Sequence, residues 1–141
     1  MTDLTHAQVL GALALADPQA LHSLAEALLP ALMPVEVVHS RTGLIMLPLR
    51  DTVKGTDFHL GEVLVAEAHI RAGGRDGYGL LPGRDLDRAM AMAVADLAWQ
   101  QGGPAAAQVA ALAATARADA TARDANTFRA VEATRVQMET F

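Results

Sequence analysis

The spacing of apolar residues along the chain changes twice, and these changes divide it into helical and extended parts. In the first part, leucine and alanine recur every three or four residues, which predicts two amphipathic helices. Asp17 and Pro18 separate the two, because Asp is a favourable N-cap and Pro is tolerated at the first helical position. Pro30 is expected to bend or end the second helix.

In the middle of the chain the apolar residues alternate in part and many are β-branched, which predicts strands. The segments expected to form them are 35–41, 44–50, 58–71 and 78–81. Thr42-Gly43 and Gly73-Gly74 are turn signals between neighbouring strands. Pro48 cannot donate to a strand ladder, so its strand is expected at an edge or near a strand end.

After the strands the helical spacing returns. Asp85 can cap a helix with an apolar stripe of Leu86, Met90, Ala93, Val94 and Leu97, and Gly102-Gly103-Pro104 should end it. The chain as a whole is expected to form one α+β domain over residues 1–141. It would contain two N-terminal helices, a four-stranded, mainly antiparallel sheet, one helix after the sheet and a long Ala-rich C-terminal helical arm.

The arm, about residues 105–141, is rich in alanine and has a high helix propensity. Its early part has a stripe of larger apolar residues, but over 118–125 the apolar face is alanine alone. Large apolar residues return at Phe128, Val131 and Met138. Such a thin face packs only against a very close neighbour, so the arm either docks on another subunit or is a solvated surface helix.

Composition and charge narrow the classes of function. The net charge is −5 without a basic stripe, which argues against nucleic acid or an anionic membrane as the main partner. The absence of cysteine excludes thiol nucleophiles, disulfides and cysteine-ligated metals or clusters. The N-terminus lacks the basic region of a signal peptide, so a cytoplasmic location is expected. Aromatic residues are only 4%, and self-association into a homodimer through apolar surface stays open.

One candidate binding site is Gly83-Arg84-Asp85, which lies between the last predicted strand and the helix that follows it. A helix N-terminus attracts phosphate, and Arg84 could grip a phosphate oxygen. The alternative is structural and commoner: Gly83 makes the turn and Asp85 caps the helix.

A second candidate is Glu62, which lies between apolar residues on the longest predicted strand. A half-buried carboxylate needs a basic partner, and the candidates are Arg41, Arg50 and Arg84. Such a pair is more often structural than catalytic.

The histidines of the predicted strands are the remaining candidates for a metal site. His39 could meet His59 or His69 across the sheet, but a recognisable third ligand is lacking, so we expect no metal and no cofactor bound by this chain alone. The sequence contains no recognisable nucleophilic triad, and we predict no catalytic residue.

Several short motifs also occur in a fixed order and at fixed spacings. They are Thr42-Gly43-Leu44-Ile45-Met46, Gly55-x-x-Phe58-x-Leu60-Gly61-Glu62, Ile70-Arg71, Gly79-x-x-x-Gly83-Arg84-Asp85 and Ala133-Thr134-Arg135-Val136. In this combination the chain resembles the PhnG family, subunits of the carbon–phosphorus lyase system for phosphonate breakdown. The resemblance covers residues 41–98 well and the last dozen residues more loosely.

The resemblance implies a subunit that acts with PhnH, PhnI and PhnL. Together they would transfer the ribose triphosphate of ATP to an alkylphosphonate such as methylphosphonate, releasing adenine and giving α-D-ribose 1-methylphosphonate 5-triphosphate. ATP would be a substrate of the complex, PhnI would carry the nucleosidase chemistry, and PhnJ would later cleave the C–P bond. The family has no catalytic residue to assign to a position here, which implies a non-catalytic subunit of an enzyme complex.

The residues expected at interfaces with partner subunits are Phe58, Glu62, Arg84, Asp85, Phe128, Val131, Arg135 and Met138. Two alternatives come from other classes. One is a stand-alone homo-oligomeric enzyme that acts on a phosphorylated small molecule through Arg84 and Glu62. The other is a small-molecule module that binds phosphate.

Overall fold

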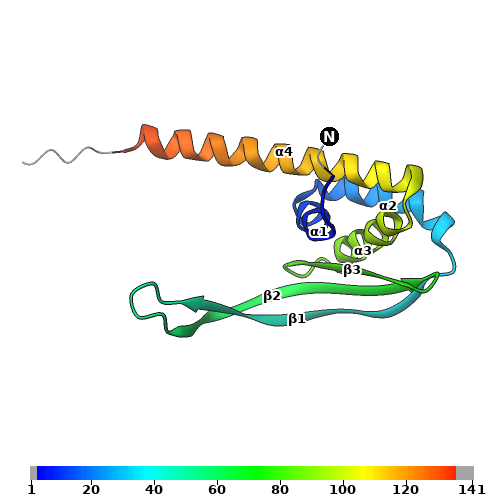
Figure 1. Cartoon of the computed structure of the whole chain (residues 1–141), viewed down its shortest axis with the longest axis horizontal. Helices are drawn as coiled ribbons and strands as arrows, with labels where there is room; N and C mark the ends of the chain where they lie inside the picture. Colours follow the sequence, from blue (N-terminus) through cyan, green and yellow to red (C-terminus); the bar gives the residue numbers. More distant parts are fainter. Residues whose placement is uncertain (1–2, 136–141) are drawn as a thin grey trace, which may run out of the picture.

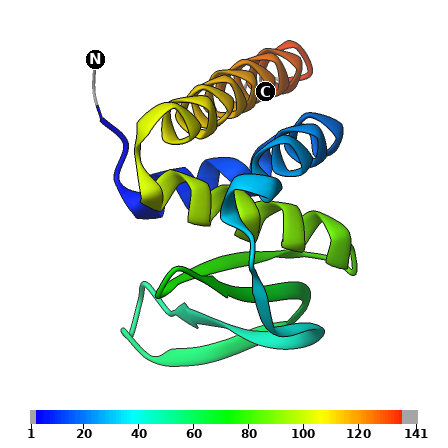
Figure 2. The same cartoon turned by 90° about the vertical axis from the view of Figure 1, so that its right-hand side faces the viewer.

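The structure, a computed structural model, describes residues 3–135, which form four helices and a three-stranded sheet. In chain order the elements are α1 (His6–Leu15), α2 (Pro18–Leu32), β1 (Glu36–Arg50), β2 (Asp57–Ala72), β3 (Arg75–Pro82), α3 (Leu86–Gln101) and α4 (Gly103–Ala133). The sheet and α4 lie on opposite sides of α1, α2 and α3 (Figures 1 and 2). The core is built from buried residues of all four helices and of β2 and β3.

The sheet has three antiparallel strands in the order β1-β2-β3, so the prediction of four strands was wrong. The segments 35–41 and 44–50 belong to one continuous strand, because Thr42 and Gly43 stay in the ladder and pair with β2. Gly43 does not have a positive φ, so it does not turn the chain. The long β2 offers a partner to almost every residue of β1, and this pairing outweighs the local turn tendency of Thr-Gly.

The predicted turn at Gly73-Gly74, between β2 and β3, is confirmed. Gly73 and Gly74 have φ of +59° and +76°, which glycine adopts at no steric cost, and the two residues form a tight hairpin loop. β3 starts directly after it at Arg75, three residues earlier than expected. Pro48 lies on edge strand β1, close to its end and at a register shift, as its missing N–H predicts.

The predicted helix caps are confirmed. The Asp17 side chain accepts the Ala20 N–H at the start of α2, and the Asp85 side chain accepts the Arg88 N–H at the start of α3. Pro30 lies inside α2, which continues for two more residues.

Helix α3 is buried almost all round, not along one stripe. Every residue from Ala91 to Ala98 is buried, whereas Leu86 at the start of the helix is exposed and Met90 is half-buried. This follows from its position, because α3 packs on β2 and β3 on one side and on α1, α2 and α4 on the others.

Two glycines of β3 let α3 approach the sheet. A methyl group at Gly79 would lie 1.9 Å from the Ala89 carbonyl oxygen, and one at Gly77 would lie 2.5 Å from the Ala93 carbonyl oxygen. Both distances are far below van der Waals contact. These two positions therefore form a groove in which the backbone of α3 lies.

The predicted long C-terminal helix is present as α4. Its buried residues are Val109, Ala113 and Ala116, all in its first half. The second half runs past the other helices and extends from the body, on the same side as the end of the β1-β2 hairpin (Figure 1). Among the described residues, the helices include none with the length and apolar character needed to cross a membrane.

Candidate functional site

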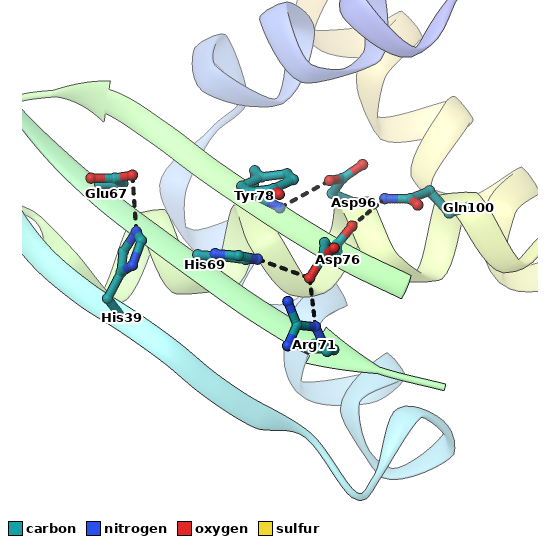
Figure 3. A network of polar contacts seen from close by, with 8 residues as sticks. All are labelled: His39, Glu67, His69, Arg71, Asp76, Tyr78, Asp96 and Gln100. Atoms are coloured by element: carbon teal, nitrogen blue, oxygen red, sulfur yellow. Dashed lines mark hydrogen bonds and ion pairs between the residues drawn. The ribbon is translucent and has the colours of Figure 1, made fainter. Parts of the chain in front are cut away.

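The face of the sheet turned away from α3 carries polar side chains from all three strands (Figure 3). They are His39, Arg41, Glu67, His69, Arg71, Asp76 and Tyr78, and we call them the polar row. Alternation along each strand puts them opposite the buried Ala66, Ala68 and Ile70, which face the core. Strand pairing then brings residues distant in sequence side by side.

Glu67 forms one unit of the polar row. Its Oε1 lies 3.0 Å from His39 Nε2, and its Oε2 accepts a hydrogen bond of 3.1 Å from Arg41 Nε. The hydrogen bond with His39, followed by that with Arg41, lowers the pKa of Glu67 below the usual glutamate value. The carboxylate is therefore ionised at neutral pH and engaged through both oxygens.

Asp76 forms a second unit of the same kind. Its Oδ1 lies 2.9 Å from His69 Nε2 and accepts a hydrogen bond of 2.9 Å from Arg71 Nε. The hydrogen bond with His69, followed by that with Arg71, lowers the pKa of Asp76. The His69 ring also stacks on Tyr78, with ring centroids 4.5 Å apart.

The two units join through His39 and His69, whose rings meet edge-on with centroids 5.3 Å apart. This confirms that His39 meets a histidine of the neighbouring strand. Residues 3–135 contain no group of three or more His, Asp or Glu side chains placed to hold a metal ion. Ionised carboxylates that are already paired make poor general acids, so the polar row suits recognition of another surface better than chemistry.

The same face becomes apolar towards the end of the hairpin. Ile45 and Leu80 are 40% and 45% exposed and flank the buried Val65. Together with Arg41 and Glu67 they line a shallow hollow of about 440 Å³. Polar pairs and apolar side chains thus share one open face, which is the composition of a protein interface.

The end of the β1-β2 hairpin exposes large apolar side chains in addition. They are Leu44, Met46, Leu47, Leu49, Phe58 and Leu60. No helix covers this part of the hairpin, which extends beyond α1 and α3 in Figure 1. Alternation places these side chains on both faces of the hairpin, and exposed large apolar side chains in this number are typical of an interaction site.

Asp96 is a functional-site candidate that the sequence analysis missed. It is fully buried on α3, accepts the Tyr78 N–H at 3.0 Å and contacts His6 Nε2. The His6 ring in turn stacks on Trp99. One carboxylate therefore joins α1, α3 and the strand that carries part of the polar row. The signal was available as a single acidic residue within the apolar run from Met90 to Trp99.

The structure places the two predicted hairpin residues on β2. Phe58 pairs with Leu49 near the end of the hairpin and is exposed. Glu62 pairs with Met46 and is also exposed, so its prediction as a half-buried carboxylate was wrong. Within residues 3–135 it has no ion-pair partner, and it is Glu67 that binds Arg41.

Arg84 and Asp85 lie at the start of α3. Asp85 is the N-cap, and Gly83 has a φ of +104°, as the structural alternative predicts. Arg84 is exposed. The carboxylates of Asp85 and Asp87 stand at this helix N-terminus and favour the cap over a bound phosphate.

The remaining predicted residues belong to the arm. Phe128 and Val131 lie on α4 and are 64% and 60% exposed, and Arg135 forms an exposed ion pair with Glu132 at 3.8 Å. Met138 lies outside the described residues. The described members of this predicted set therefore do not form one site: they lie on the hairpin, at the start of α3 and in the C-terminal part of α4 or just after it.

Comparison with known proteins agrees with the motif resemblance. Residues 5–141 match the family described as "Phosphonate metabolism protein PhnG". No curated protein matches the chain in sequence. Because the family match spans nearly the whole chain, from α1 to the C-terminus, the chain belongs to the PhnG family of phosphonate metabolism proteins.

Proposed function

We propose that this chain is a non-catalytic subunit of the complex that activates phosphonates. The complex would transfer the ribose triphosphate of ATP to an alkylphosphonate and release adenine. Methylphosphonate would give α-D-ribose 1-methylphosphonate 5-triphosphate. The chain's contribution would be to bind and orient partner subunits of the PhnH, PhnI, PhnJ and PhnL types.

The observation that carries this proposal is the open face of the sheet. A sheet normally buries both faces or turns a polar face to water, whereas this one exposes Ile45, Leu47 and Leu80 beside the polar row. The hydrophobic side chains favour burial, and the paired charges favour one orientation of the partner.

The chemistry of the polar row supports a binding role over catalysis. Glu67 and Asp76 are each paired with a histidine and an arginine, Glu67 through both carboxylate oxygens and Asp76 through Oδ1, which suits an ion pair better than a free base. This pairing supports the proposal that the reacting groups, and the site that binds ATP, belong to a partner subunit.

The experiment compares two leucines that differ only in position. Leu80→Lys places a charge on the open face beside the hollow, and Leu15→Lys places the same charge at an exposed residue of α1. Each variant is co-expressed with the partner subunits, and co-purification and adenine release from ATP with methylphosphonate are measured. We expect Leu80→Lys to lower both at least tenfold, because a buried unpaired charge opposes docking, and Leu15→Lys to keep both.

The proposal fails if the wild-type chain does not co-purify with the partners. Equal co-purification of the two variants would remove the open face from the interface. Circular dichroism of each variant separates loss of binding from loss of fold.

A further inference from the structure

We infer that α4 pairs in an antiparallel direction with α4 of a second copy of this chain. This inference concerns a surface other than the open face of the sheet, and it does not depend on the proposed function. It is carried by a repeat along α4, by a hollow beside that repeat and by the placement of charges on either side of it.

The repeat lies on the side of α4 that is turned away from the body. The residues that α4 buries against its own chain are Val109, Ala113 and Ala116. On the opposite side, residues that are small except for the last one, Phe128, recur at alternate spacings of four and three, which is the repeat of a two-helix coiled coil. They are Ala107, Ala111, Ala114, Ala118, Thr121, Ala125 and Phe128, and we call them the seam.

The seam is accessible. Its members are exposed, except Ala125, which is half-buried. Alanine at nearly every seam position lets a second helix approach closely, but it provides little area for a partner with irregular side chains. A straight helix with the same small residues is the shape that fits.

A hollow of about 600 Å³ lies at the N-terminal end of the seam. Asp3 and Leu4 line one part of it, and Ala110, Ala111 and Arg117 of α4 line another. Its lining is mainly apolar, and it is large enough for one aromatic and one aliphatic side chain. The two large apolar side chains of α4 itself, Phe128 and Val131, are at the opposite end of the helix and are exposed.

An antiparallel pair of identical helices brings these two ends together. When Ala118 faces Thr121 of the second copy, the coiled-coil repeat puts Phe128 of the second copy opposite Ala111. Val131 of the second copy then falls opposite Ala110. Each exposed large side chain therefore meets the hollow, and twofold symmetry fills both hollows at once.

The charges beside the seam select the same register. Arg117 and Asp124 occupy equivalent positions one heptad apart, and in the antiparallel pair Arg117 of each copy faces Asp124 of the other. A parallel pair in register would instead place Arg117 opposite Ala122 and Asp124 opposite Arg129, and it would leave both hollows without Phe128. The antiparallel register is the one that satisfies the charges beside the seam and also fills the hollows.

A charge-swap series on the full chain tests this pairing. Analytical ultracentrifugation is expected to show a wild-type dimer of twice the 14.8 kDa chain mass. Arg117→Asp and Asp124→Arg each create like-charge contacts, so each is expected to raise the dissociation constant about tenfold or more. The double variant reverses both signs and is expected to restore wild-type association. Arg123→Asp changes the same charge on the side of α4 away from the seam and is the matched control.

Cross-linking then checks the direction of the helices. The chain has no cysteine, so Ala114→Cys with Ala125→Cys is expected to give a disulfide-linked dimer on mild oxidation, and Ala114→Cys alone is not. The inference is overturned by a monomeric wild type at every concentration, by single charge variants that associate like the wild type, or by a double variant that does not recover.

Discussion

A single carboxylate, that of Asp96, connects the inside of the protein with its open face. The Asp96 side chain accepts a hydrogen bond from the backbone N–H of Tyr78. The Tyr78 ring stacks on His69 on the open face of the sheet. His6 reaches the same carboxylate from the other end of the chain. The position of the polar row therefore depends on a buried polar contact, which fixes geometry more strictly than apolar packing does.

Replacing Asp96 with alanine is expected to lower the free energy of unfolding by about 1–3 kcal/mol, because the Tyr78 N–H loses its acceptor in a part-buried position. Asp96→Asn keeps an acceptor oxygen and should cost less. Urea unfolding measures both changes. Asp119→Ala on the exposed side of α4 is the control, and a loss for Asp96→Ala as small as that of Asp119→Ala would contradict the expectation.

The two glutamates of β2, Glu62 and Glu67, show which properties of a single residue can be predicted from the sequence pattern. Alternation along a strand correctly separates Glu62 from Glu67 by face. It does not say where along the strand the helical layer stops. Glu62 lies beyond the cover of α3 and is exposed, whereas Glu67 lies opposite Arg41 and forms the ion pair. That distinction comes from strand register, which only the assembled sheet defines.

Among the elements, β3 and α3 depend on each other most closely. The close approach at Gly79 and Gly77 has no equivalent in the open part of the hairpin, where a methyl group at Gly43 or Gly61 would have no neighbour within 4 Å. Glycines in one sheet therefore have two different roles. Composition alone does not show which glycine has which role.

Gly79→Ala is expected to destabilise the protein by about 1–3 kcal/mol or more, because the added methyl group must displace the α3 backbone. Gly43→Ala adds the same group to open space at an unstrained φ, and it should change stability by less than about 0.5 kcal/mol. Thermal and urea unfolding of the pair provide the measurement. Equal stability of the two variants would show that α3 can shift without cost.

The elements that the sequence predicted well are those with local signals. Asp17, Asp85 and the Gly73-Gly74 turn each act through neighbours within a few residues, and each is confirmed. The errors concern long-range pairing. The join at Thr42-Gly43 depends on a strand that follows later in the chain, and the burial of α3 on all sides depends on α4.

At the scale of the whole molecule, the core occupies only part of the length of the structure. The second half of α4, about 25 Å of helix from Arg117 to Ala133, buries no residue within the described chain. The hairpin end likewise extends past α1, α2 and α3 (Figure 1). The residues proposed for association are therefore largely separate from those of the core.

Truncation after Arg123 is expected to leave the free energy of unfolding within about 1 kcal/mol of the wild-type value, because residues 124–135, the described part of the removed segment, include no buried residue. Dimer formation, in contrast, should be lost with Phe128 and Val131. Urea unfolding and ultracentrifugation of the same sample measure the two effects. A truncated chain that unfolds much more easily would place the removed segment in the core.

Strand β1 lies at the edge of the sheet with no helix over its outer side, and a long apolar edge can act as a template for fibrous growth. Its ladder is irregular between Val37 and His39 and again between Leu47 and Pro48, where the proline also removes a donor. Only the stretch between these two points offers a regular row of backbone groups. These two interruptions shorten the regular edge on which another strand could pair, and removing Pro48 is expected to lengthen that edge.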